Sequence, residues 1–231
     1  MGALAGWLPG HIVRKAPPSP TLDFRALVGE AGWARLPLAV RHRFGPHAHL
    51  LGEETVYQAP MVVRATGPAR WLAQLCRLLG TPLAPWTGEA VRVRVTVRRD
   101  ARGLVWDRLY HFPGRRPLLV TSRKQAGRPG ELLEMARGGL CLRSEVTVEN
   151  AALHFRGLGY VWILGPLTLP IPTWLTPGAA HVVHEDLGEG RFRFTMRFVH
   201  PWWGETVFQE GMFYDPVAAT AWEEPAGSVS R

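Results

Sequence analysis

The sequence predicts an α+β domain made mainly of a predominantly antiparallel, strongly curved β-sheet or partial β-barrel, with one or two N-terminal helices and a further helix packed on the sheet. Two observations predict this class. Helical spacing of apolar residues is confined to the first 80 residues, and from about residue 90 onward short segments alternate apolar and polar side chains. Because so many short strands joined by tight turns cannot form a flat, open sheet, we expect the sheet to curl toward a barrel.

The chain length of 231 residues and the hydrophobic content of 46% fit one folded domain with a sizeable core. Residues 1–20 contain four prolines and predict a loosely ordered arm. We expect the single domain to span residues 21–215. A weakly ordered tail is expected over residues 216–231, because prolines and glycine interrupt any regular element there.

The N-terminal part of the domain predicts helices and one strand. Between Asp23 and Phe44 the apolar residues approach helical spacing, and Pro37 breaks the pattern, which predicts two short helices or one kinked helix. Residues 53–64 are rich in β-branched and aromatic side chains and predict a strand. A helix is expected over residues 69–79, between a proline and a glycine. Its apolar stripe predicts that it lies flat on the sheet; the stripe consists of Trp71, Leu72, Leu75, Leu78 and Leu79.

The remaining elements are strands. Residues 90–99 alternate valine with polar or charged residues, which is typical of a strand with one face in the core. Turn residues separate further predicted strands at 104–112, 118–124, 132–136, 140–148, 153–156, 159–164, 181–187, 191–200 and 206–214. The very apolar stretch 157–178 contains four prolines, so it predicts a strand and a proline-rich turn rather than a membrane span.

The net charge of +8 is typical of proteins that bind phosphate groups. Here the charge comes almost entirely from arginine, since Lys15 and Lys124 are the only lysines, and this favours solvated strand faces over a nucleic-acid surface. Cys76 and Cys141 match no metal or redox spacing. Together with the lack of an export signal, they predict a cytoplasmic protein without a transmembrane segment.

The predicted strand 104–112 places a lone arginine in an aromatic row. Leu104, Trp106, Arg108, Tyr110 and Phe112 share one face. Arg108 then either binds an anionic group, stacks on aromatic rings at a barrel mouth, or extends from the sheet rim into solvent.

The predicted strand 191–200 carries a second aromatic face, formed by Phe192, Phe194, Met196 and Phe198, which ends at His200. His200 is a candidate acid or base, because the ordinary pKa of histidine lies near neutral pH. Glu134 and Glu210 are further candidates for proton transfer, because each lies in an otherwise apolar strand. A salt bridge to arginine is the alternative role of these carboxylates.

Signatures of cofactor and metal sites are missing from the sequence. His47 with His49, and His181 with His184, each supply two metal ligands, but no third ligand follows at a recognised spacing. The sequence contains neither a glycine-rich phosphate loop before a helix nor a nucleophile elbow. We therefore expect no metal site and no bound cofactor.

Several short motifs follow one another in a fixed order along the chain. The motifs are Leu36-Pro37 after a helix, Leu79-Gly80-Thr81-Pro82, Trp106-Asp107-Arg108 with Phe112, Leu169-Pro170-Ile171-Pro172 with Trp174, Leu175 and Pro177, and Phe192-Arg193-Phe194 leading to His200-Pro201, Gly204 and Gly211. Over residues 22–214 this order resembles DUF4166, a bacterial family of domains of unknown function.

The resemblance implies a domain that occurs alone or behind a dinucleotide-binding, reductase-like domain, and hence a functional association with a reductase-like protein. It implies no established activity. Trp106 and Arg108 keep the family's Trp-x-Arg pattern, which supports a role for Arg108 beyond the rim. Gln209 stands where the family pattern has an aromatic residue, which puts a pocket role for this position in doubt.

Three functions remain open at this point. The first is binding of a small apolar or amphipathic ligand in a pocket lined by Trp106, Phe112, Phe192, Phe194 and Phe198, with Arg108 holding an anionic group. The second is an isomerase or cyclase that acts on such a ligand through His200, Glu134 or Glu210. The third is an interaction or nucleic-acid-binding module whose surface consists of Arg92, Arg94, Arg98, Arg191, Arg193 and Arg197.

Overall fold

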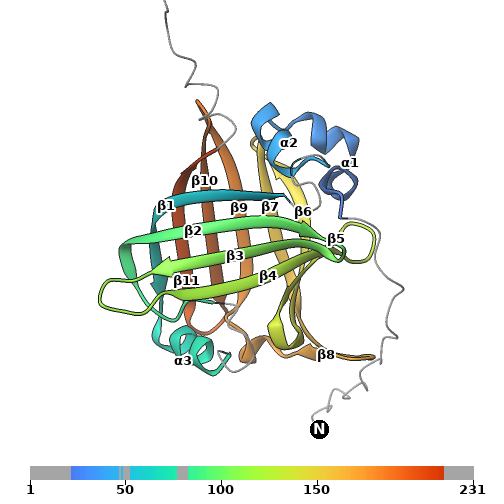
Figure 1. Cartoon of the computed structure of the whole chain (residues 1–231). Coiled ribbons are helices and arrows are strands. Elements are labelled where there is room, and N and C mark those ends of the chain that lie inside the picture. Colours follow the sequence, from blue (N-terminus) through green and yellow to red (C-terminus); the bar gives the residue numbers. More distant parts are fainter. Residues whose placement is uncertain (1–21, 47, 49–52, 77–82, 216–231) are drawn as a thin grey trace, which may run out of the picture.

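The structure is a computed structural model that describes residues 22–46, 48, 53–76 and 83–215, so the predicted arm and tail lie outside the described residues. Eleven strands form one sheet, and because β6 also pairs with β7, ten of them close into an antiparallel barrel with β8 attached outside the ring (Figure 1). The predicted fold class is confirmed. The strands are β1 (Glu54–Ala65), β2 (Gly88–Asp100), β3 (Gly103–His111), β4 (Leu118–Ala126), β5 (Glu131–Ala136), β6 (Leu140–Glu149), β7 (Ala152–Leu164), β8 (Leu167–Ile171), β9 (Ala179–Gly188), β10 (Arg191–His200) and β11 (Gly204–Tyr214).

The barrel is a meander in which each strand pairs with the next one, apart from the excursion to β8. The ring closes where β1 runs antiparallel to β11, with Met61–Ala65 opposite Val207–Gly211. An even number of strands makes this last pairing antiparallel, and closure leaves neither β1 nor β11 as a free edge.

Strand β7 is shared between the barrel and its extension. Its first half, Leu153–Arg156, pairs with β9, whereas its second half, Tyr160–Leu164, pairs with β8. Both halves pair with β6 on the other side. The sequence predicted two strands here, at 153–156 and 159–164, but the chain continues from one into the other with a register shift opposite Arg143 and Ser144. Strand β8 was missed in the proline-rich stretch.

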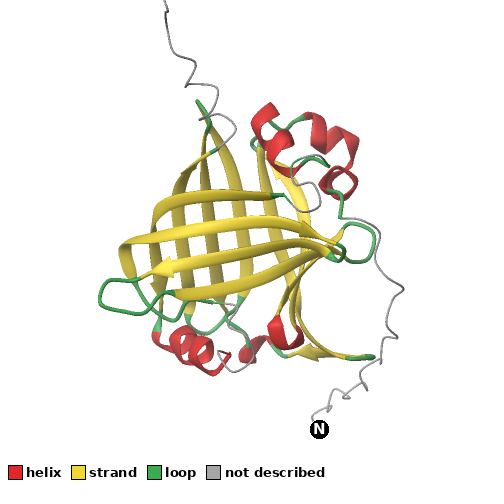
Figure 2. Cartoon of the chain, in the orientation of Figure 1, coloured by secondary structure: helices red, strands yellow, loops and turns green. Residues whose placement is uncertain are grey.

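Two helices cover one opening of the barrel (Figure 2). They are α1 (Phe24–Ala34) and α2 (Leu38–Phe44), and Pro37 separates them as the sequence predicts. Phe24 and Phe44 pack edge to face with ring centroids 5.0 Å apart, and both lie within 6.1 Å of the Phe155 ring on β7. The helices thereby extend the apolar core out of the barrel end.

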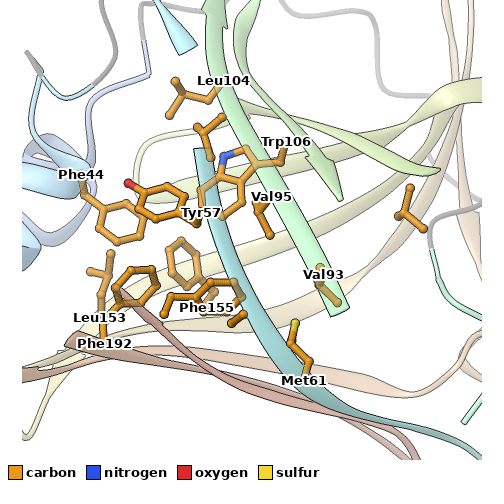
Figure 3. Close-up of a cluster of buried hydrophobic side chains, with 14 of the residues drawn as sticks. Phe44, Tyr57, Met61, Val93, Val95, Leu104, Trp106, Leu153, Phe155 and Phe192 are labelled. Carbon is orange, nitrogen blue, oxygen red and sulfur yellow. The ribbon is translucent and has the colours of Figure 1, made fainter. Parts of the chain in front are cut away.

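The core fills the part of the barrel beneath these helices. Figure 3 shows Tyr57 and Met61 from β1, Val93 and Val95 from β2, and Phe155 and Phe192 converging on one volume. The alternation that the sequence shows at 90–99 is present here, since Val91, Val93, Val95 and Val97 are at most 8% exposed. The inward row of each strand therefore builds the barrel interior.

The third helix, α3 (Gly67–Cys76), packs near β11 at the other end of the barrel with a different face from the predicted one. Ala69 and Ala73 are its buried residues, while Trp71 and Leu75 are 79% and 60% exposed. The predicted apolar stripe was wrong for Trp71 and Leu75, because small side chains allow the closer approach to the sheet, whereas Leu72 is half-buried. Leu78 and Leu79 lie outside the described residues. Among the described residues, no helix is both long and apolar enough to cross a membrane.

Candidate ligand-binding site

The barrel interior contains two cavities that meet at Arg108. The smaller has a volume of about 30 Å³ and lies on the side of α2, where Tyr57, Trp106 and His184 line it. The larger has a volume of about 120 Å³ and lies on the side of α3. Arg108 lines both cavities, so the inward row of β3 connects them.

The larger cavity is mainly apolar with a few polar groups. Its apolar walls come from α3, β6, β9 and β10, and include Leu72, Leu142, Val182, Met196 and Phe198. Its charged and hydroxyl groups include Arg108, Ser122, Glu134 and Tyr160. Such a lining is typical of sites for small organic molecules, in which polar groups orient an otherwise apolar ligand.

Glu134 on β5 is the centre of a buried charge cluster that borders the larger cavity. Its Oε1 accepts hydrogen bonds from Arg108 Nη2 at 2.9 Å and from Ser122 Oγ at 2.6 Å. Its Oε2 accepts a hydrogen bond from Lys124 Nζ. The side chains of Arg108 and Lys124 are 14% and 8% exposed. The Glu134 cluster, as we call Arg108, Ser122, Lys124 and Glu134, thus holds two largely buried cations on one carboxylate, whose side chain is 22% exposed.

The register of three neighbouring strands brings the cluster together. Strand β3 pairs with β4, and β4 with β5, so that Lys124 lies directly opposite Glu134 and Arg108 opposite Val120. The inward row of β4 runs Leu118, Val120, Ser122, Lys124. Lys124 therefore points into the barrel because it lies on the same face of β4 as these residues.

Electrostatics in the Glu134 cluster keep its carboxylate ionised. Burial alone would raise the pKa of Glu134, but the charges of Lys124 and Arg108 outweigh it and hold that pKa well below its usual range. Burial lowers the pKa of Lys124, and the charge of Arg108 lowers it further against the opposing effect of Glu134. With all three groups charged, the cluster carries one uncompensated positive charge.

His184 on β9 occupies the smaller cavity within a cage of aromatic rings. The rings of Phe44, Phe194 and Trp106 lie 4.9, 5.3 and 5.9 Å from the imidazole centroid. Burial, with added repulsion from Arg43, lowers the pKa of His184 well below its ordinary value. Its Nδ1 has no hydrogen-bond partner among the described residues. His184 is therefore a neutral core histidine.

The predicted ligand-binding residues divide between the two cavities. Phe192, Phe194 and Trp106 line the smaller cavity and Phe198 lines the larger one. Phe112 lines neither, because its ring packs 5.3 Å from that of Trp86 and 6.0 Å from that of Tyr110.

The three candidates for proton transfer are not brought together. Only Glu134 lies beside Arg108. His200 stacks on Trp203 with ring centroids 4.0 Å apart, and its Nδ1 accepts a hydrogen bond from the Trp202 backbone N–H at 3.2 Å. Glu210 lies on the outer face of β11, where it accepts a hydrogen bond from Thr195 Oγ1 at 3.3 Å. Neither His200 nor Glu210 lines either of these two cavities.

Sequence reasoning missed three residues of the interior. Ser122 and Lys124 lie on the inward face of β4, so the alternation of side chains over 118–124 could have identified them as interior residues. Gln209 faces inward as well, where its Oε1 accepts a hydrogen bond from the Tyr110 hydroxyl at 2.9 Å. Its Nε2 has no hydrogen-bond partner among the described residues.

Metal ligands do not cluster in the part of the chain that the structure describes. His181 pairs with His154 on β7, Nε2 to Nδ1, at 3.0 Å, and not with His184. His47 and His49 lie outside the described residues.

The arginine-rich faces of β2 and β10 do not form one surface. Strands β1 and β11 separate them in the sheet. Several of these arginines are also neutralised, since Arg98 pairs with Asp107, Arg193 with Glu185 and Arg197 with Glu205.

Comparison with known proteins gives one match. A family model described as Domain of unknown function (DUF4166) matches residues 36–213. No curated protein and no solved structure matches the chain.

Proposed function

The chain belongs to the DUF4166 family of domains of unknown function, and we propose that it binds a small amphipathic molecule inside the barrel, with the anionic group held at Arg108. The observation that carries this proposal is the position of Arg108. Its side chain is only 14% exposed, it lines both cavities, and with Lys124 it shares the single carboxylate of Glu134, which leaves one excess positive charge when all three groups are ionised.

The excess positive charge of the Glu134 cluster favours binding of an anion. An unpaired charge in an apolar interior is costly, and a ligand carboxylate or phosphate would compensate it. Glu134 fixes the orientation of the Arg108 guanidinium through one nitrogen, Nη2. Ser122 adds a hydroxyl beside the same site.

The size of the larger cavity sets the class of ligand. A volume of about 120 Å³ holds roughly four water molecules, at the ~30 Å³ that each takes up in the liquid. An apolar cavity of about 150 Å³ takes up benzene, so the cavity encloses roughly six non-hydrogen atoms, and a longer chain would reach out past Leu175, which lines the cavity and is 48% exposed. The apolar walls favour a hydrocarbon chain or ring system over a sugar. The association with a reductase-like protein, which the family resemblance implies, stays a prediction.

Calorimetric titration with octanoate and octan-1-ol tests the proposal, because the two probes differ mainly in charge. We expect wild type to bind octanoate more tightly than octan-1-ol. In the Arg108→Gln variant the affinity for octanoate should fall about 10- to 100-fold, the equivalent of one charge-assisted hydrogen bond, while that for octan-1-ol should stay within about twofold.

Arg92→Gln is the matched control, since Arg92 is exposed on β2 and has no ion-pair partner among the described residues. It should bind both probes as wild type does. The Glu134→Gln variant removes the competing carboxylate and should bind octanoate more tightly. Equal affinity of wild type for both probes, or unchanged octanoate binding by Arg108→Gln, would refute the proposal.

A further inference from the structure

Four tryptophans are exposed at the barrel end that carries α3. Trp71 on α3 is 79% exposed and Trp174 in the 3-10 turn η3 (Thr173–Leu175) is 54% exposed. Trp202 and Trp203, in the turn between β10 and β11, are 70% and 47% exposed. We call these residues the tryptophan rim.

Hydrogen bonds place the three segments of the tryptophan rim side by side. The Thr66 N–H, just before α3, donates to Thr206 O at 2.9 Å. Thr206 Oγ1 in turn donates to Pro177 O, just after η3. In Figure 2 the short helices at this end lie opposite α1 and α2.

Two of the three segments of the tryptophan rim, α3 and η3, also contribute to the wall of the larger cavity. Leu175, next to Trp174, lines the cavity and is also 48% exposed. Leu72 and Cys76, on the same helix as Trp71, line the cavity as well. At these two segments the exposed apolar surface of the rim thus adjoins the cavity wall.

Charge at the rim is low and positive. No Asp, Glu, Lys or Arg occurs between Arg156 and His181, a stretch that includes β8 and η3. Arg70 on α3 and Arg137 in the 3-10 turn η2 (Arg137–Gly139) are exposed and have no ion-pair partner among the described residues. The acidic residue Glu205 is paired with Arg197.

We propose that the tryptophan rim docks on the surface of an anionic phospholipid bilayer. Tryptophan places an apolar ring and a polar N–H at the boundary between headgroups and acyl chains, and exposed arginines bind anionic headgroups. The net charge of +8 adds long-range attraction to such a surface. It also opposes face-to-face pairing of two copies through the rim, because the exposed Arg70 and Arg137 of one copy would repel those of the other. Docking goes beyond the proposed function, because it does not require the Arg108 site.

Co-sedimentation of the full chain with vesicles tests this proposal. We expect binding to vesicles of phosphatidylcholine with 30% phosphatidylglycerol, and binding at least about tenfold weaker to pure phosphatidylcholine, since each basic side chain adds attraction to anionic lipid. The triple variant Trp71→Ser, Trp174→Ser, Trp202→Ser should lose about tenfold or more in affinity for the mixed vesicles. Brominated lipid should quench wild-type tryptophan fluorescence more strongly than that of the triple variant.

The matched control replaces three exposed apolar side chains away from the rim: Leu38→Ser on α2, with Met212→Ser and Tyr214→Ser on β11, which are 61%, 47% and 62% exposed. It should bind the mixed vesicles like wild type. Equal loss in both triple variants, or no vesicle binding by wild type, would overturn the proposal. So would a dimer, seen by sedimentation velocity, that only the tryptophan variant abolishes, because a second copy would then be the occupant. Octanoate binding, measured on the same proteins, reports separately on the Arg108 site.

Discussion

At the scale of single residues, Glu134 is the group on which the interior depends most. Among the described residues it is the only carboxylate paired with Arg108 and Lys124, whose side chains are 14% and 8% exposed. Removing one partner of a buried ion pair leaves the other charge uncompensated, which typically costs more than the pair itself contributes. The carboxylate therefore makes a positively charged interior compatible with folding.

Replacement of Glu134 should destabilise the protein in a pH-dependent way. At pH 7 the Glu134→Gln variant should lose about 3–5 kcal/mol in free energy of unfolding. The pKa of Glu134 is depressed in the folded protein, so its contribution is complete above the ordinary value of 4.5 and declines as the pH falls below it. Urea denaturation between pH 7 and pH 3 should therefore show the gap between wild type and variant narrowing below pH 4.5.

Glu205→Gln is the control for this series, because Glu205 and Arg197 form a largely exposed pair. Its loss should stay below about 1 kcal/mol at every pH. If Glu134→Gln does not fold, the double variant Arg108→Gln, Glu134→Gln, with one cation fewer, replaces it. A gap that stays constant down to pH 3 would contradict the role assigned to Glu134.

The surroundings of single side chains could be predicted only in part from the sequence. Alternation within one strand gives the phase of a side chain, so the inward position of Arg108 followed from Trp106 and Tyr110 on either side of it. The partners of Arg108 depend on the register of β3, β4 and β5, which the sequence does not encode locally. From the sequence alone, a salt bridge between Glu134 and an arginine was therefore one of two possible roles of this carboxylate, and Arg108 could not be identified as the partner.

At the scale of elements, one glycine fixes how η3 meets the barrel. Gly178 has a φ of +111°, and a Cβ placed on it would lie 2.4 Å from the carbonyl of Val199 on β10. The chain after η3 thus presses backbone against backbone at the end of β10. This contact holds Thr176 and Pro177 in the wall of the larger cavity.

Two alanine substitutions distinguish the stability cost of the close contact with β10 from the cost of a positive φ alone. Gly178→Ala should cost about 3 kcal/mol or more, because both the positive φ and the close backbone contact oppose it. Gly165→Ala also has a positive φ, +57°, but no atom lies within 4 Å of its Cβ position, so it should cost about 1 kcal/mol. Thermal unfolding measures both. Equal losses would mean that the contact with β10 contributes nothing.

The helix α3 shows why an apolar stripe can mislead. Periodicity predicted correctly that a helix forms here, but it assigned the largest side chains to the core. Ala69 and Ala73 are 2% and 1% exposed instead, and Trp71 belongs to the tryptophan rim. An exposed tryptophan that serves a surface has the same hydrophobicity as a buried one, so composition alone cannot separate the two roles.

At the scale of the whole molecule, the pairing of β7 with β9 is the shortest in the ring among the described residues, with four residue pairs against five between β1 and β11. The closing seam joins β1 to β11 over Met61–Ala65, where Met61 and Val63 are at most 3% exposed. The seam between β7 and β9 spans only Leu153–Arg156, because the rest of β7 turns toward β8. A seam with fewer backbone pairs opens at a lower free energy.

Native-state hydrogen exchange should resolve this difference. We expect amides of β1 and β11 to exchange only through global unfolding, whereas amides of β7 and β9 at their shared seam exchange through a local opening of lower free energy. Mass spectrometry of exchanged fragments, followed as a function of added denaturant, distinguishes the two. Exchange at one common free energy across all four strands would contradict the expectation.

The fold class was predictable and the closure was not. The period-two segments after residue 90 determine an antiparallel meander, and hairpin turns pair consecutive strands. The pairing of Met61 with Gly211 joins residues from opposite ends of the domain. No local pattern specifies such a contact; it follows from the twist accumulated over ten strands. The family resemblance given by the motifs is confirmed over residues 36–213.

The segment that contains β8 and η3 can change in length and sequence without altering the ring of ten strands. It begins after the residues of β7 that pair with β6 and β9, and it returns at β9, so its length does not affect how the ten ring strands pair with one another. Yet Ile171, Leu175 and Pro177 form part of the cavity wall. A lineage could alter the ligand that the barrel accepts by insertions and substitutions within residues 165–177 alone. Selectivity and foldability would then evolve under separate constraints.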